Sequence, residues 1–392
     1  MNNKRTFLTS LLITATLLMH CGGDDEMPPT PTEPALTGIE LTTNAEYTVT
    51  DNPRPVQLEV TGIWDDGSQS RLNDYSILVN GEDRGKLLNF MSEEAGSFNL
   101  QATVEGQESA AKTIVVRPAL NLETKTFTVI FHIVHDGEPV GTGYNIEASR
   151  IDYQMDLLAR TFERHNRYTP NSTMPMMKFE LAATDPNGNS LSEPGINRLQ
   201  RPSPEASILF QDWMWDHYWD PDYYINVWVG DTQNGYSWGI YPSMSCDNDE
   251  PLAGLGCADL DTPQQLEGIA LELENLWQEN WVFPHEMGHV FGLFHVFEGH
   301  ECSHDVDHCA DTEQYSRAVY ESGADVVTRE ACSGRTFTSY NIMDYWRQPN
   351  GQRDLSYDQV LRIRQVIEKG NFRGQKSLAE GTPRKMERPG GG

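Results

Sequence analysis

Residues 285–295 read HEMGHVFGLFH, so three histidines and one glutamate occur within eleven positions. His285 and His289 are four residues apart, which places both imidazoles on one face of a helix, one turn above the other. Two imidazoles in this arrangement can bind the same metal ion. The segment therefore predicts a helix that presents a metal site, and the surrounding chain has to bury that helix.

Gly292 is predicted to end this helix. A glycine can adopt the left-handed conformation that stops a helix and turns the chain sharply. Such a turn would bring His295 back toward the same ion as a third ligand. Three histidine nitrogens leave the fourth tetrahedral position of a zinc ion open for water, which is the layout of a catalytic zinc site rather than a structural one.

Glu286 is predicted to be the general base, because it lies beside the first histidine and outside the ligand face. Zinc lowers the pKa of a bound water to about 7, and a nearby carboxylate can then accept its proton. The alternative is a core helix that is rich in histidine by accident. With 11 histidines in 392 residues, chance produces such a pattern on the order of once in ten thousand sequences of this kind.

HEMGHVFGLFH resembles the extended zinc signature of the metzincin peptidases. Downstream, SYNIMDYW at 339–346 resembles their Met-turn. The resemblance implies that Met343 forms an apolar floor under the zinc ligands. It also implies that Tyr345 lies near the metal and helps to stabilise the oxyanion. An ordinary packed tyrosine is the alternative for Tyr345, since aromatic side chains are often buried in cores.

The pappalysin branch of the metzincins is the closer resemblance, and it spans most of residues 125–370. Its supporting segments occur in the family's order and spacing: FHIVHDG, MKFELAATDPNGN with GINR, WDPDYYINVWVG, GLFHVFEGHEC, DHCADT, NIMDYW and SYDQVLRIR. The resemblance implies a zinc-dependent endopeptidase that acts on polypeptides. The fold it implies is an α+β metzincin-like catalytic domain, with a mixed twisted sheet and an active-site helix. Two positions depart from the family pattern, Val296 and Cys309.

Residues 299–312, GHECSHDVDHCADT, are themselves rich in metal ligands. His300, His304 and His308 recur at a spacing of four, which is the pattern of a second transition-metal site. The family resemblance instead implies a disulfide-tied surface loop, in which Asp307 and Asp311 are the candidate ligands of Ca²⁺.

The first residues are predicted to form a targeting segment. Lys4 and Arg5 precede the apolar stretch FLTSLLITATLLM, which is too short to span a bilayer and suits a secretory signal. The stretch leads into LMHC, which resembles a bacterial lipoprotein signal, although His20 departs from the small residue usual there. Residues 1–20 are thus a predicted signal peptide and Cys21 the predicted lipidation site, with plain secretion as the alternative.

This interpretation places the protein outside the cytoplasm, as an outer-membrane or cell-surface lipoprotein or else a secreted protein. Contact with the membrane would be made through the lipid anchor only. Residues 21–35 contain several prolines and no apolar periodicity, so they are predicted to be an extended tether.

Residues 36–118 are predicted to form a small antiparallel β-sandwich. In SFNLQATVEG, the residues Phe98, Leu100, Ala102 and Val104 share one face, as in a half-buried strand. Turn sequences such as DDGS separate the strands. GIWDDGS followed later by EEAGSFNLQATVEG resembles bacterial immunoglobulin-like domains. We expect a spacer or an adhesion module, and the lack of histidine, cysteine and any catalytic constellation in this segment favours a spacer.

Residues 119–375 are predicted to form the metzincin-like zinc metallopeptidase domain, because strands alternate with a helix there. The remainder, 376–392, is polar and predicted to be disordered. The expected elements are strands at 127–134, 176–183 and 223–230, an edge strand at 235–242, a helix at 147–165, and a helix after 356 that begins with a Ser356–Gln359 capping box. The segment 266–295 is expected to contain a long helix, in which Pro284 either interrupts the helix or lies in the first turn of a new helix that starts at His285.

Six cysteines occur, and after Cys21 five remain in an exported chain. Disulfides are therefore expected, with one cysteine left over. Cys246–Cys257 is the natural short-loop pair. A second bridge joins Cys332 to either Cys302 or Cys309.

The formal net charge of −29 argues against binding to nucleic acid, because an acidic surface repels phosphate. The alternative to a peptidase is a cell-surface adhesin or other binding protein, in which the metal-binding domain is not proteolytic. A protein of that class would show no proteolysis, and it would still bind its ligand after zinc is removed.

Overall fold

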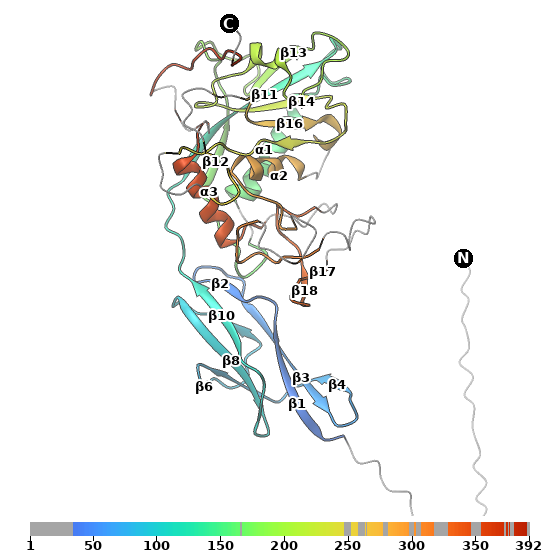
Figure 1. Cartoon of the computed structure of the whole chain (residues 1–392), viewed down its shortest axis with the longest axis vertical. Coiled ribbons are helices and arrows are strands. Elements are labelled where there is room, and N and C mark those ends of the chain that lie inside the picture. Colours follow the sequence, from blue (N-terminus) through green and yellow to red (C-terminus); the bar gives the residue numbers. More distant parts are fainter. Residues whose placement is uncertain are drawn as a thin grey trace, which may run out of the picture.

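The chain forms an N-terminal domain of strands and a C-terminal domain of strands and helices (Figure 1). The computed structural model describes residues 34–164, 167–246, 252–257, 263, 265–276, 281–297, 302, 307–316, 328–345, 354–371, 374, 376 and 380–389. The predicted signal peptide, the predicted lipidation site Cys21 and most of the predicted tether lie outside the described residues.

The N-terminal domain is a β-sandwich of two sheets. One sheet has the order β1-β3-β4 with β7 beside β3, and the other has the order β2-β10-β8-β5-β6 with β9 beside β8. The pairs are antiparallel except β2 with β10, which is parallel. The strands are β1 (Leu36–Thr43), β2 (Tyr47–Val49), β3 (Val56–Trp64), β4 (Gln69–Arg71), β5 (Ser76–Val79), β6 (Glu82–Asp83), β7 (Asn89–Phe90), β8 (Gly96–Val104), β9 (Gln107–Glu108) and β10 (Lys112–Arg117).

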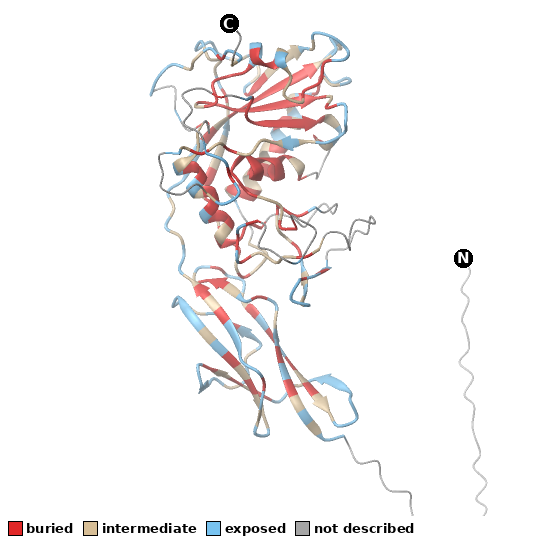
Figure 2. Ribbon diagram, viewed as in Figure 1, coloured by how far each residue is buried: buried red, intermediate tan, exposed pale blue. Residues whose placement is uncertain are grey.

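Alternating apolar residues place the core of this domain between its two sheets. Val56, Leu58 and Val60 of β3 are buried, and they pack with Leu100 and Ala102 of β8. Buried and exposed positions alternate along these strands (Figure 2). Two sheets thus share one core in this part of the chain, while the parallel pairing of β2 with β10 departs from the purely antiparallel arrangement predicted for residues 36–118. The assignment to the immunoglobulin-like class stays a prediction.

The C-terminal domain is built on one mixed sheet with the order β12-β11-β14-β16-β15, and β13 pairs with β11. All pairs are parallel except β15 with β16, which is antiparallel, so β15 is an edge strand within the predicted segment 235–242. The strands are β11 (Lys125–His135), β12 (Met177–Leu181), β13 (Ile196–Gln200), β14 (Ile225–Gly230), β15 (Trp238–Gly239) and β16 (Ile269–Glu272).

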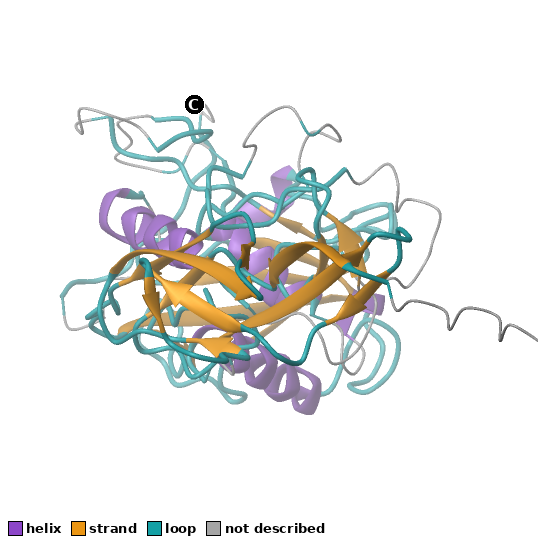
Figure 3. Ribbon diagram, turned by 90° about the horizontal axis from the view of Figure 1, so that it is seen from below, coloured by secondary structure: helices purple, strands orange, loops and turns teal. Residues whose placement is uncertain are grey.

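The labelled helices lie in the C-terminal domain (Figure 1). Seen from below, helices lie around the strands (Figure 3). Every residue of β14 is buried, as expected for a parallel strand covered on both faces. The remaining elements are α1 (Ala148–Phe162), η1 (Asp212–His217), η2 (Leu273–Leu276), α2 (Val282–Val290), the hairpin of β17 (Thr328–Glu330) and β18 (Thr336–Thr338), and α3 (Tyr357–Lys369).

The long helix predicted over 266–295 is wrong in its first part. Residues 269–272 form β16, and all four are buried in the sheet. A short apolar run such as IALE suits a buried helix and a buried strand equally, because both lack a polar face. The helix that carries the histidines begins only at Val282, and Pro284 lies in its first turn.

The capping box predicted for the last helix is confirmed. The Ser356 hydroxyl accepts a hydrogen bond from the backbone N–H of Gln359, and the side-chain oxygen of Gln359 accepts one from the backbone N–H of Ser356. The C-terminal segment behaves differently from its prediction as a disordered tail. In its described part, 380–389, Met386 is buried in an apolar cluster and Arg384 pairs with Asp220. Those contacts do not fit disorder.

Candidate metal centre

Helix α2 carries the first two histidines on one face. The ring centres of His285 and His289 are 4.8 Å apart, and both side chains are buried. The remaining residues of α2 after Val282 are also buried, so the helix lies in the core of the domain. Its first turn accepts Pro284 because backbone N–H groups there have no partner within the helix.

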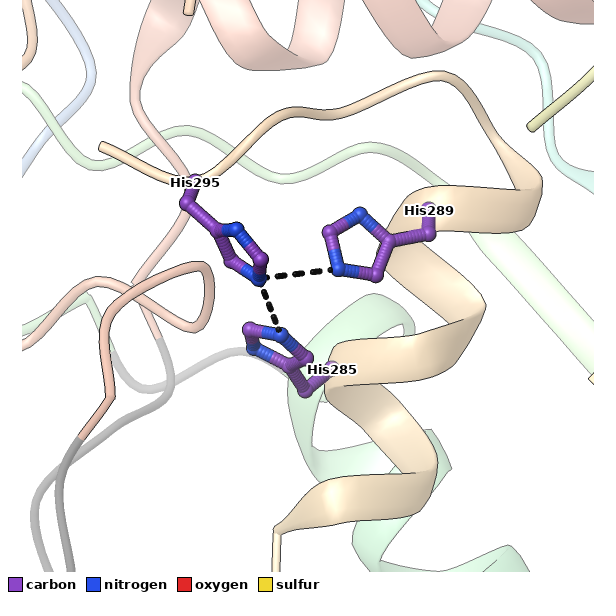
Figure 4. A group of neighbouring side chains, drawn as sticks. All are labelled: His285, His289 and His295. Carbon is purple, nitrogen blue, oxygen red and sulfur yellow. Dashed lines mark hydrogen bonds between the residues drawn. The ribbon is translucent and has the colours of Figure 1, made fainter. Parts of the chain in front are cut away.

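The chain turns back directly after α2, as the glycine predicted. Gly292 has φ +82°, and a Cβ there would lie 2.8 Å from Cγ2 of Val366 in α3. The carbonyl of Gly292 accepts a hydrogen bond of 2.6 Å from Nε of Arg362. This turn returns His295 to the helix, and its Nε2 lies 3.1 Å from Nε2 of both His285 and His289 (Figure 4).

The outer nitrogens of the two helical histidines are held by backbone carbonyls. Nδ1 of His285 donates to the carbonyl of Ile342, and Nδ1 of His289 donates to that of Leu293, each over 2.7 Å. Such bonds fix the tautomer and leave the Nε2 lone pair available to a metal. Burial lowers the pKa of His285 to about 3, with His295 acting in the same direction, so this ring is neutral.

The three nitrogens fit a metal ion. The ligand atoms all lie within 4.8 Å of one another. Four ligands arranged tetrahedrally at about 2.0–2.1 Å from zinc would lie roughly 3.3 Å apart, close to the observed spacing. Lone pairs that converge in a buried place repel one another, and a cation removes this repulsion. Among the residues that the structure describes, His285, His289 and His295 are the group able to hold a metal in this way.

Glu286 follows His285 directly in α2 and is not one of the three clustered ligands. Its side chain is buried, and burial raises the pKa of the carboxyl to about 8. The backbone N–H of Gly239, in the edge strand β15, donates to it and acts in the opposite direction. A cation held by the histidines would also favour the charged carboxylate.

Met343 packs directly against helix α2. It is fully buried, and a Cβ on Gly288 would lie 2.4 Å from its sulfur. The absence of a side chain at Gly288 therefore permits this close contact. The residue before Met343 supplies the carbonyl that holds His285. These contacts agree with the predicted floor under the ligands.

Tyr345 lies over the histidines. Its ring centre is 4.6 Å from that of His295 and 5.5 Å from that of His285, and the side chain is 46% exposed. The backbone of Tyr345 is held by Arg329, whose Nη2 donates to its carbonyl over 3.2 Å. The alternative interpretation was an ordinary tyrosine packed in the core. The exposed side chain of Tyr345 does not fit that alternative.

The other predicted ligands lie elsewhere. The carboxylate of Asp307 accepts hydrogen bonds from Thr312 and from the backbone of Cys309. That of Asp311 accepts bonds from Ser356 and from the backbone of Asp358, at the start of α3. His300 and His304 lie outside the described residues, and the ring of His308 packs 5.6 Å from Phe294.

Two disulfides tie the loops around the site. Cys246–Cys257 is confirmed, and Cys332 pairs with Cys302 rather than with Cys309. Cys309 is a buried free thiol, and burial raises its pKa.

Sequence reasoning missed the contribution of Gly239. A Cβ on this residue would lie 2.3 Å from the carbonyl oxygen of Glu286 and 3.0 Å from Cβ of His289. Only a glycine lets the edge strand approach α2 so closely and donate to the buried carboxyl. The signal was present in GYSWGIYP as a glycine within a predicted strand, which often marks close approach of another backbone.

We expect Gly239→Ala to push β15 away from α2. The clash is with backbone atoms that cannot rotate aside, so unfolding free energy should fall by roughly 1–3 kcal/mol and catalytic activity with it. Gly256→Ala is the matched control, because a Cβ at Gly256 meets no atom within 4 Å. Urea unfolding and peptide-cleavage rates measure both effects. Equal stability and activity in the two variants would contradict the role given to Gly239.

Comparison with known proteins finds similar metalloproteases. Residues 209–368 match the model of the Peptidase_M43 family, described as pregnancy-associated plasma protein-A. An extracellular metalloprotease of Verticillium alfalfae is 23% identical over 263 residues, which are 65% of this chain and 78% of that protein. One from Sordaria macrospora is 27% identical over 251 residues, or 62% and 74% of the two chains.

Over residues 209–368, the chain is similar to the pappalysin-type metalloproteases.

A similar fold is found in a solved structure. A promirolysin mutant from Tannerella forsythia matches with a TM-score of 0.50 and 20% identity, over 63% of this chain and 81% of that one. Within the described residues of the metalloprotease, no helix is both long and apolar enough to cross a bilayer.

Proposed function

We propose that this metalloprotease is a zinc-dependent endopeptidase, with Glu286 as general base and His285, His289 and His295 as metal ligands. The observation that carries the proposal is the convergence of three Nε2 atoms, two of them from the helix that also bears the buried carboxyl of Glu286. Three protein nitrogens leave one position of a tetrahedral zinc ion free, as catalytic zinc sites require. Zinc bound there would supply a Lewis acid for the scissile carbonyl and for a water molecule.

The chain's own residues carry the proton transfers in this proposal. Glu286 accepts a proton from the attacking water and then donates it to the leaving amine. The N–H of Gly239 orients its carboxylate. Tyr345, which reaches over His285 and His295, donates to the oxyanion that develops on the substrate.

The substrate would bind as an extended polypeptide along β15. Among the residues that the structure describes, this short strand pairs with β16 on one side only, so a peptide would pair with its other side. An added strand gains main-chain hydrogen bonds, and neighbouring side chains set the specificity. Tyr236 and Trp238 are both exposed on this edge and would contact such a peptide.

Export is part of the proposal. Relatives named extracellular metalloproteases support an extracellular site of action. Attachment through a lipid on Cys21 and binding of Ca²⁺ by Asp307 and Asp311 are retained as predictions. A calcium ion would have to share those carboxylates with the hydrogen bonds described above.

Cleavage of a peptide library by the purified full chain tests the proposed function. We expect cuts at internal peptide bonds, loss of cleavage after treatment with a chelator, and recovery when zinc is returned, because the ion supplies part of the chemistry. Mass spectrometry of the products measures the cut positions. Cleavage that resists the chelator would contradict zinc dependence, and removal of terminal residues alone would contradict an endopeptidase. A chain that binds zinc and cleaves nothing would favour the adhesin alternative.

A further inference from the structure

The turn between β2 and β3 attaches the N-terminal sandwich to the metalloprotease domain. Asn52 in this turn is 2% exposed. Its Nδ2 donates to the carbonyls of Thr169, Pro170 and Ser172 at 2.8–3.0 Å, and its Oδ1 accepts from the backbone of Arg54. A buried amide with every group satisfied specifies one geometry for the two parts it joins.

The loop that Asn52 holds is in turn bound to Asp354. The backbone N–H groups of Tyr168 and Thr169 donate to the carboxylate of Asp354 over 2.7–3.0 Å, and the hydroxyl of Thr169 adds a bond of 2.7 Å. Asp354 is 3% exposed. The position of this carboxylate therefore depends on the loop of residues 168–172. Asn52 of the sandwich holds that loop through its hydrogen bonds.

Asp354 reaches the metal centre through the Met-turn. The backbone N–H of Ile342 donates to the carbonyl of Asp354 over 3.0 Å, and the N–H of Asp354 donates to Tyr340 over 2.8 Å. The carbonyl of Ile342 is the group that holds Nδ1 of His285. A continuous series of buried contacts thus runs from Asn52 to the first predicted ligand.

A second series of contacts begins at Arg117, the last residue of β10. Its guanidinium forms a bidentate pair with Asp358 in the first turn of α3, and it lies between the rings of Tyr47 and Tyr357 at 5.0 and 4.9 Å. One turn further along α3, Arg362 donates to the carbonyl of Gly292. This is the turn that brings His295 to the site, so the second series ends at the third predicted ligand.

We propose that the N-terminal sandwich is a positioning part of the metal centre, acting through Asn52 on His285 and through Arg117 on His295. The sequence alone favoured a spacer for this domain. The proposal rests on the proposed zinc site, since the quantity that the sandwich sets is the geometry of its ligands. Outer contacts of this kind fix ligand orientation and tune metal affinity.

Zinc affinity of the full chain tests the coupling. We expect Asn52→Ala and Arg117→Gln each to raise the zinc dissociation constant at least about fivefold, the lower end of ordinary coupling between sites. Competition with a coloured chelator measures it, and the visible spectrum of the cobalt-loaded protein reports the ligand geometry. Ser109→Ala is the matched control, because the buried Ser109 hydroxyl accepts from the backbone N–H of Ala102 and donates to the carbonyl of Ala110, both within the sandwich.

Wild-type protein provides a second measurement that needs no variant. Coupling is reciprocal, so removal of zinc should speed amide exchange in residues 49–54. Unchanged zinc affinity in both variants, or equal weakening by Ser109→Ala, would overturn the proposal. A wild-type chain that does not bind zinc would instead refute the proposed function.

Discussion

Glu286→Gln is expected to lower kcat/KM for peptide cleavage by about 10²–10⁴-fold while the zinc content stays the same. Glutamine has the same shape but cannot accept the proton of the attacking water. Its amide oxygen still accepts the N–H of Gly239, and a neutral side chain suits a site where burial already raises the pKa of the carboxyl to about 8. The fold should therefore be kept. Metal analysis and steady-state kinetics on the same preparation measure both quantities.

Glu267→Gln is the matched control for this experiment. Glu267 is also a buried glutamate of the metalloprotease domain, and it accepts a hydrogen bond from Ser243 that glutamine can preserve. This variant should retain wild-type kinetics. A zinc-loaded Glu286→Gln protein with full activity would exclude Glu286 as the general base.

His295→Ala is expected to have the second large effect, a loss of tight zinc binding. Removal of an outer contact to a ligand lowers metal affinity about 10–100-fold. Removal of the ligand itself should exceed that range, because two histidines on α2 would remain with water in place of the third. Cleavage should fall with zinc occupancy, and titration against a competing chelator measures the affinity.

His308→Asn is the control, since it removes a histidine from the neighbouring loop at a residue with φ +57°, a conformation that asparagine tolerates. It should bind zinc as the wild type does and should retain a stoichiometry of one. The wild type could instead bind a second equivalent of zinc that His308→Asn does not bind. That result would support the second metal site predicted from residues 299–312. Tight zinc binding by His295→Ala would show that His295 is not a zinc ligand.

The local part of the site could be predicted from sequence because its determinants are close together. Helical spacing placed His285 and His289 on one face, and the left-handed glycine at 292 made the turn that returns His295. The capping box of α3 was predictable for the same reason. Each of these features depends on fewer than a dozen consecutive residues.

The supporting contacts could not be predicted because they join distant segments. The carbonyl of Ile342 reaches His285 across 57 residues, and Asn52 reaches Ser172 across 120. Local periodicity carries no information on such pairs. The same limit explains the error at β16, where the run IALE is a strand only because β14 and β15 lie on either side of it.

A crystal structure of the full chain loaded with zinc is the most direct test of the proposed three-histidine zinc site. We predict one zinc ion bound by Nε2 of His285, His289 and His295 at about 2.0–2.1 Å, with a water or substrate oxygen in the remaining position. A bound zinc ion with the His295 ring directed away from it would contradict the account.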